Sequence, residues 1–182
     1  IEGKAKLMAI TGHFTCDNSY SVWAGTVTGV VSEIFAPTTN TQASEIWRGE
    51  DLPPIELVSG CYLYICAWSD DDMYQGLLGS FTGSFTIHTG DPRWRVLATG
   101  RNKGDNDDLD QAEINAAIAA AQPADWVVPF VGAANSDTPH PWDNVIDGIG
   151  PEAHWIWHDS NKDLRAKHPN PPYVPFAGFN HD

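Results

Sequence analysis

Short runs of apolar and β-branched residues, broken by Gly, Pro, Asn and Asp, follow one another through the first hundred residues. This spacing is typical of antiparallel strands joined by turns, and it disfavours βαβ units. Strands are predicted at 7–15, 20–26, 29–35, 55–58, 62–68, 80–88 and 94–99, with surface loops at 37–42 and 48–54. The pattern therefore predicts an all-β core.

One helix is predicted at about 108–121, where Ala and Ile recur on one face before Pro123 ends the segment. The acidic residues at 105–110 stand at its start, where carboxylates can cap free N–H groups and complement the helix dipole. Two further strands are predicted at 126–129 and 153–158. The helix is thus an insertion in an otherwise β-rich chain.

The 182 residues suffice for about one domain. We expect a β-sandwich domain with an inserted helix at 1–158 and an extended Pro-rich arm at 159–182. The predicted fold is a mainly β, antiparallel, jelly-roll-like β-sandwich with one short α-helix and this C-terminal arm.

The arm carries an apolar strip, PPYVPFAGF, in a stretch that prolines keep extended. Its predicted assembly residues are Tyr173, Phe176 and Phe179. We expect the strip to dock on another subunit, and docking on the arm's own sandwich is the alternative.

Charge and composition narrow the functional classes. Charged residues make up 19% of the chain and aromatic residues 11%, a composition that fits neither a disordered chain nor a coiled coil. The net charge of −14 repels phosphate backbones and anionic lipids, so no nucleic-acid partner is expected. No window has the ~20 continuous apolar residues of a membrane span, so no membrane insertion is expected.

Three cysteines are few for a disulfide scaffold. Cys61 and Cys66 lie five residues apart in one predicted strand and face opposite ways, so they are not expected to pair with each other. For an extracellular chain we predict a disulfide between Cys16 and either Cys61 or Cys66. Three buried free thiols are the alternative. The chain begins with Ile1, which suggests a processed product or a fragment and agrees with a removed signal peptide.

Asp70, Asp71 and Asp72 directly follow an apolar strand. Several carboxylates at one point suit Ca²⁺, so these residues are the candidate metal ligands, and a plain hairpin turn is the alternative. The acidic residues at 105–110 do not have EF-hand spacing and are better explained as a helix cap. No other cofactor is predicted.

The chain lacks the common catalytic signatures. It has no G-x-S-x-G elbow, no H-E-x-x-H motif and no P-loop, and its many carboxylates single out no glycosidase pair. His154 and His158 would share a face of a strand but lie too far apart for one metal ion. The remaining histidines, His13 and His88 among them, are scattered and predict no cluster. A non-catalytic protein is expected.

The eight tryptophans favour recognition, because aromatic faces stack on sugar rings and anchor protein interfaces. Trp23, Trp47 and Trp142 sit beside polar or loop-forming neighbours and are the candidate ligand-binding residues. A position in the core or at its rim is the alternative for each of them.

Several short motifs together resemble a known family. Residues 16–25 (CDNSYSVWAG) resemble the D-x-x-Y-x-L-Y-x-N-G strand and turn of galactose-binding-like jelly rolls, and 153–157 (AHWIW) resemble their A-x-W-I-W strand. With YLYICAWSDD at 62–71 and QGLLG at 75–79, the chain is also similar to uncharacterised secreted bacterial proteins. Here the W-I-W strand follows the D-x-x-Y strand, and Ala24 replaces the turn asparagine.

The resemblance implies a β-sandwich, an extracellular or cell-surface location and sugar recognition, with Asp17 and Asn18 as further ligand candidates. Two functions follow from an acidic, aromatic-rich sandwich. The first is adhesion or self-assembly in a surface assembly or filament, with further copies or other surface proteins as partners. The alternative is a monomeric lectin-like module that binds glycans, and a hydrolase is less favoured. The two functions predict different surfaces. An assembling subunit should have an edge that binds a neighbour, and a lectin-like module should have a Trp/Asp-lined groove.

Overall fold

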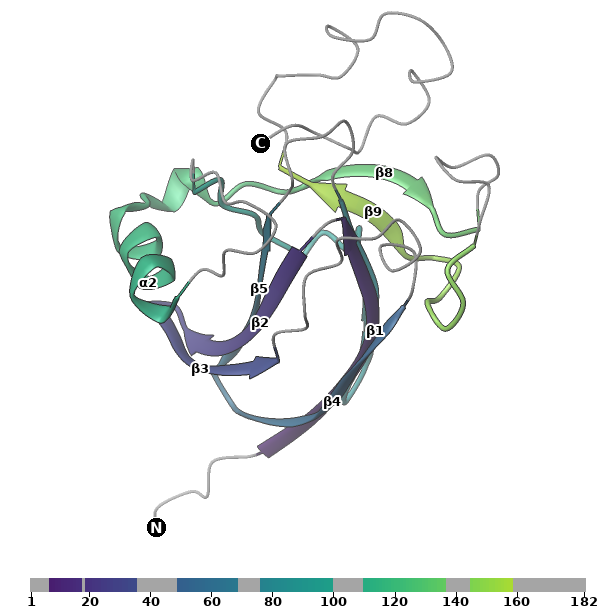
Figure 1. Cartoon of the computed structure of the whole chain (residues 1–182), viewed down its shortest axis with the longest axis horizontal. Coiled ribbons are helices and arrows are strands. Elements are labelled where there is room, and N and C mark those ends of the chain that lie inside the picture. Colours follow the sequence, from purple (N-terminus) through teal and green to yellow (C-terminus); the bar gives the residue numbers. More distant parts are fainter. Residues whose placement is uncertain are drawn as a thin grey trace, which may run out of the picture.

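The fold is known from a computed structural model, shown in Figure 1. The structure describes residues 7–17, 19–35, 49–68, 76–99, 110–136 and 145–158. Within these ranges the protein is mainly β, with antiparallel strands in two facing sheets and one short α-helix. The predicted jelly-roll-like sandwich is therefore confirmed as the fold class.

The large sheet has six strands. They are β1 (Leu7–Asp17), β4 (Glu50–Val58), β6 (Gly76–Thr82), β7 (Thr86–His88), β8 (Phe130–Ala134) and β9 (His154–Trp157). Their order is β4-β1-β6-β9-β8, and β7 pairs with β6. Strands β4 and β8 are thus the outer strands of this path in the described part of the chain.

The small sheet has three strands, β2 (Ser19–Thr26), β3 (Gly29–Phe35) and β5 (Tyr62–Trp68), in the order β3-β2-β5. From β1 to β6 the chain passes repeatedly between the two sheets, as it does in jelly rolls. Two antiparallel sheets that each bury one face against the other form a sandwich core.

Aromatic and aliphatic side chains from alternate strand positions fill the space between the sheets. Phe14 of β1 lies edge-on to Tyr20 of β2, with ring centroids 4.7 Å apart. Phe81 of β6 packs on Phe14, and Val22 of β2 belongs to the same buried cluster. Period-two alternation places these residues on the inner faces, and burial of such large rings is the main stabilising contribution of this core.

The other face of the small sheet is covered by helix α2 (Gln111–Ala120), which Figure 1 shows beside β2 and β3. Ile114 of the helix packs with Trp23, Val30 and Trp68 in a second buried cluster. Asp110 caps the helix, because its carboxylate accepts from the Glu113 N–H at 2.8 Å. The predicted acidic cap and the Ala-rich helix are confirmed, with the helix shorter than 108–121.

Four predicted elements have different bounds in the structure. The run 80–88 contains a hairpin, in which β6 begins earlier, at Gly76, and β7 returns beside it. The predicted loop 48–54 is mostly part of β4. The predicted strands 94–99 and 126–129 meet only in a single bridge between Val96 and Val127. The short 3-10 helix η1 (Pro123–Asp125) follows α2, and the strand of this region is β8.

The predicted arm at 159–182 lies outside the described residues. The domain boundary at residue 158 therefore stays a prediction. Within the described ranges, no helix has the length and the apolar run that crossing a bilayer requires.

Candidate functional site

Most predicted site residues lie outside the described part of the chain. These are Asn18, Trp47, Trp142, the acidic residues Asp70, Asp71 and Asp72, and the arm residues Tyr173, Phe176 and Phe179. Of Asp17 only the backbone is described, and it pairs with Gly76. The predictions for all of these residues stay predictions.

Trp23 is a core residue and not a ligand platform. Only 5% of its surface is exposed, and it packs with Val30 and Ile114 beneath helix α2. Its indole Nε1–H donates to Ser21 Oγ at 2.8 Å, so its polar group is satisfied inside the protein. The prediction for Trp23 was wrong because the helix buries a face of the small sheet that the sequence pattern leaves open to solvent.

The predicted disulfide is absent from the structure, in which all three cysteines are free thiols. Cys16 lies in the core between the sheets, whereas Cys66 packs against the cluster beneath helix α2, on the other face of the small sheet. A bond between them would have to cross that sheet. Cys61 lies at the start of β5, outside both clusters, next to the turn that follows Val58. The structure therefore agrees with the alternative prediction that the three cysteines are free thiols.

The ends of four strands lie together at one end of the two sheets. Asp17 pairs with Gly76, and Ser19 pairs with Trp68, so the ends of β1, β2, β5 and β6 lie together. Ser19 Oγ and Trp68 Nε1 are both buried and have no hydrogen-bond partner in the structure. Buried polar groups are normally paired with protein or ordered water, so this end has unused hydrogen-bonding capacity.

Polar side chains form a row across four strands on the outer face of the large sheet. His13 of β1 is paired in register with Asp51 of β4 on one side and with Ser80 of β6 on the other. Ser80 is in turn paired with His88 of β7. Directly opposed residues of antiparallel strands share a face, so the row reads Asp51, His13, Ser80, His88. The sequence pattern did not predict that His13 and His88 both lie opposite Ser80.

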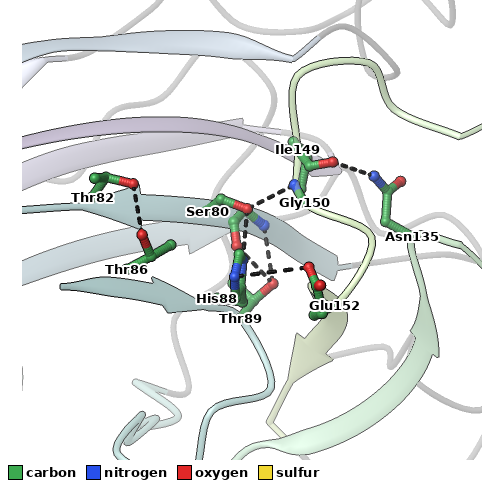
Figure 2. Close-up of polar contacts among 10 residues, drawn as sticks. Ser80, Thr82, Thr86, His88, Thr89, Asn135, Ile149, Gly150 and Glu152 are labelled. Atoms are coloured by element: carbon green, nitrogen blue, oxygen red, sulfur yellow. Dashed lines mark hydrogen bonds and ion pairs between the residues drawn. The ribbon is translucent and has the colours of Figure 1, made fainter.

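Ser80 and His88 form one polar contact of this row, shown in Figure 2. Ser80 Oγ lies 2.8 Å from His88 Nδ1 and accepts a hydrogen bond from the Gly150 N–H at 2.9 Å. The opposite ring nitrogen, His88 Nε2, lies 4.0 Å from Glu152 Oε2. A hydroxyl, an imidazole and a carboxylate thus follow one another in that order.

Neighbouring main-chain bonds fix the position of the His88 backbone. Trp94 donates from its indole Nε1–H to the His88 carbonyl at 2.9 Å. The next residue, Thr89, is fully buried and exchanges hydrogen bonds with both main-chain groups of Gly79. The imidazole therefore stands on a rigid part of the sheet and not on a loose loop.

Residues 145–153, called the strap below, pass over this row. Asn135 holds the strap, donating to the carbonyls of Ile146 and Ile149 and accepting from the Ile146 N–H, all at 2.9–3.0 Å. The Ile146 and Ile149 side chains are buried beneath the strap. Gly148, whose φ of 85° suits glycine, lies against the His13 ring, and Gly150 lies against the His88 ring.

His13 and Asp51 form the other half of the row. His13 Nδ1 lies 2.6 Å from Asp51 Oδ1, and the ring is largely covered while the carboxylate is exposed. The described ranges contain no group of three or more His, Cys, Asp or Glu side chains arranged to hold a metal ion. The row combines two imidazole–carboxylate pairs with one hydroxyl, which is a set suited to proton transfer.

Aromatic rings form a short series at the edge of the small sheet. Tyr62 and Tyr64 of β5 have ring centroids 6.3 Å apart, and Tyr64 lies 6.3 Å from Trp126 in an edge-to-face arrangement. Half of the Tyr62 surface is exposed. This series presents one accessible ring to solvent and was not predicted as a site.

No protein-family model, no curated protein and no solved structure matches the chain.

Proposed function

We propose that the protein is a β-sandwich subunit of an extracellular or cell-surface assembly, and that strand β8 is the edge through which it assembles. The observation that carries this proposal is an outer strand without charge in a protein of net charge −14. Strand β8 itself (FVGAA) contains neither a charged side chain nor a proline. Exposed edges normally carry charge or proline, because a bare edge invites another strand.

Exposed valines reinforce this argument. Val128 is 55% exposed, Val131 of β8 is 42% exposed, and Val127 lies beside them. Contiguous exposed apolar residues of this kind mark interaction surfaces. Three small-sheet strands face a six-stranded sheet, so an outer strand such as β8 can extend beyond the shared core.

Two other outer strands, β4 and β3, are protected. Strand β4 carries Glu50, Asp51 and Glu56 together with two prolines, a composition that discourages pairing with another chain. Strand β3 is covered by helix α2, whose Gln111 and Asn115 donate to the Val30 carbonyl. This protection favours β8 over β4 and β3 as the assembling edge.

The proposed occupant of this edge is the C-terminal arm of a second copy. Its segment 171–179 is apolar and aromatic and carries no charge, so it complements the valines without adding to the repulsion between acidic subunits. Prolines limit the conformational entropy that an arm loses on docking. Tyr173, Phe176 and Phe179 would supply the apolar contacts.

Light scattering on three variants tests the proposal. We expect the intact chain to form dimers or larger species, and both Val131→Lys and deletion of 169–182 to give monomers with unchanged far-UV circular dichroism. Val31→Lys is the matched control, because Val31 is also an exposed valine but lies on the covered β3 edge. Assembly that survives Val131→Lys, or is lost equally in Val31→Lys, contradicts the role of β8.

A run in EDTA tests the candidate cation site at Asp70, Asp71 and Asp72 in the same instrument. If Ca²⁺ bound there supports assembly, the chelator shifts the species toward monomer and added Ca²⁺ restores it. An identical mass with and without EDTA contradicts a cation requirement. It does not affect the proposal for the β8 edge, which the variants above test separately.

Glycan binding is the second candidate function, and the aromatic series at β5 favours it. An exposed Tyr62 ring backed by Tyr64 is a surface on which a sugar ring can stack. We expect Tyr62→Ala to abolish retention on immobilised galactose-containing glycans. Phe85→Ala is the control, since Phe85 is equally exposed but lies on the β6–β7 hairpin. A monomer that binds no glycan on an array contradicts this alternative.

A further inference from the structure

We propose that Ser80 is a nucleophilic serine that accepts an acyl group from small activated esters, with His88 as its general base and Glu152 as the residue that positions the imidazole. This goes beyond the proposed assembly function and involves different residues. It rests on the order of the three groups in Figure 2 and on the hydrogen bond from Gly150.

The Gly150 contact leaves the serine hydrogen available for His88. A hydroxyl has one hydrogen to donate, and Ser80 Oγ already accepts from the Gly150 N–H. Its own hydrogen is then free to point at His88 Nδ1, 2.8 Å away. His88 accepts this bond when its ring proton is on Nε2.

Glu152 favours that arrangement of the ring. Its carboxylate lies 4.0 Å from Nε2, and a carboxylate on that side of the ring favours the tautomer with its proton on Nε2. Glu152 does not touch Ser80 in the structure, so it acts through His88. This is the logic of a nucleophile, a base and an orienting carboxylate.

The neighbouring pair Thr82 and Thr86 is an example of a contact that serves only the structure of the hairpin. Two residues along the same strands, Thr82 and Thr86 face each other through their hydroxyls at 3.2 Å. Such cross-strand hydroxyl pairs are common in antiparallel sheets. The Ser80 position differs, because its partner is an imidazole with a carboxylate on its far side.

The reaction has two balanced halves. Ser80 Oγ attacks the ester carbonyl carbon while its proton passes to His88 Nδ1. The bond from that carbon to the alcohol oxygen then breaks, and the departing alkoxide takes the proton from His88. The acyl group remains on Oγ until a water molecule, which gives a proton to His88, attacks the acyl carbon. The bond from that carbon to Oγ then breaks, Oγ takes the proton back from His88, and the carboxylic acid leaves.

The surroundings limit the substrate to small acyl groups. A Cβ atom at Gly150 would lie 2.7 Å from His88 Cε1 and 3.2 Å from Ser80 Oγ, so the strap leaves little room above the pair. The nearest main-chain donor, the Gly150 N–H, already bonds Oγ and is not free for an oxyanion. We therefore expect acylation that is faster than at an unpaired serine but slow in absolute terms, and slow turnover.

The test is labelling of the intact protein with a small fluorophosphonate and with p-nitrophenyl acetate, read by peptide mass spectrometry. We expect Ser80 to be labelled at least about 100-fold faster than Ser84, an exposed serine of the same hairpin without an imidazole partner. His88→Gln should reduce the rate at Ser80 to that of Ser84. Glu152→Gln should slow it several-fold.

Two results overturn the proposal. The first is a Ser80 rate equal to that of Ser84. The second is a rate at Ser80 that His88→Gln leaves unchanged. Glu152 is mostly exposed, so Glu152→Gln preserves the fold and keeps the test decisive even where His88→Gln lowers stability. A purely structural role predicts a lower melting temperature for Ser80→Ala together with no labelling of the wild-type residue.

Discussion

The side-chain amide of Asn115 pairs with both main-chain groups of Val30. Asn115 Oδ1 accepts from the Val30 N–H at 2.7 Å, and Asn115 Nδ2 donates to the Val30 carbonyl at 3.0 Å. The amide thus takes the place that a neighbouring strand would have along the edge of β3. Gly29 permits this approach, because a Cβ atom there would collide with the amide oxygen.

Asn115→Ala should therefore destabilise the protein by about 1–3 kcal/mol, since the Val30 N–H loses this partner in a partly buried place and the Val30 carbonyl keeps only the longer bond from Gln111. Urea unfolding measures this change. Gln111→Ala is the control, because Gln111 Nε2 makes only longer bonds, 3.2 and 3.4 Å, to the same edge. Equal losses for the two variants would argue against a special role for the Asn115 pairing.

Gly148 and Gly60 offer a matched test of the strap. Both have positive φ, 85° and 91°, so alanine at either position costs about 1–2 kcal/mol of backbone strain. A Cβ at Gly148 would also lie 2.6 Å from His13 Nε2, whereas one at Gly60 would meet nothing within 4 Å. Gly148→Ala should be more destabilising than Gly60→Ala by at least about 1 kcal/mol.

The double variant His13→Ala/Gly148→Ala separates the contact from the strain. Removing the ring should recover most of the difference between the two glycine substitutions, measured by urea unfolding against His13→Ala alone. A full additive loss in the double variant would show that His13 and Gly148 do not touch in solution.

Local patterns predicted the sandwich and the helix, but not the row on the large sheet. Strand alternation in 62–68 and the acidic cap at Asp110 are local signals, and the structure has both. Ser80 and His88 were missed because residues 80–88 were interpreted as one strand. The hairpin turns at Gly83, and only its register brings the two residues opposite each other.

His13 and Asp51 could not be paired from the sequence at all, since 38 positions separate them and only the β1–β4 register joins them. Trp23 shows the converse problem. Alternation predicts two faces for a strand but not that a helix from residue 111 onward covers the second face. Contacts between residues far apart in the sequence determine both the His13–Asp51 pairing and the burial of Trp23. Local propensities cannot predict such contacts.

The Cys66 thiol should be unreactive in the folded protein. Burial raises its pKa to about 12, while the hydrogen bond with Ser21 acts in the opposite direction. Relative to a thiol with a pKa of 9.0, the thiolate fraction below pH 9 is then roughly a thousandfold lower. Iodoacetamide alkylation at pH 8 should be correspondingly slow in the native state and fast in urea.

The same mass-spectrometric experiment without reductant checks the cysteine oxidation state. Free thiols predict that all three residues become alkylated in urea without prior reduction. Recovery of Cys16 in a disulfide with Cys61 or Cys66 would instead restore the original prediction and require a rearranged small sheet.

Asp91 and Arg93 should give the protein a small acid-dependent loss of stability. The Arg93 side chain and main-chain N–H both donate to the Asp91 carboxylate, and these bonds lower its pKa from 3.8 to about 2. A carboxyl group whose pKa is lower in the folded than in the unfolded state stabilises the fold above pH 4. That contribution disappears as the pH falls through about 2.

The melting temperature of Asp91→Asn should therefore be lower than that of the wild type between pH 5 and 7, and the gap should close as the pH is lowered from 4 to 2. The gap is expected to be modest, because Arg93 is more than half exposed and solvent screens the pair. Thermal unfolding at 1 M NaCl should narrow the gap at neutral pH as well. A difference that stays constant from pH 2 to pH 7 would mean that Asn fails at this turn for a reason other than charge, such as the lost hydrogen-bond geometry toward the Arg93 N–H.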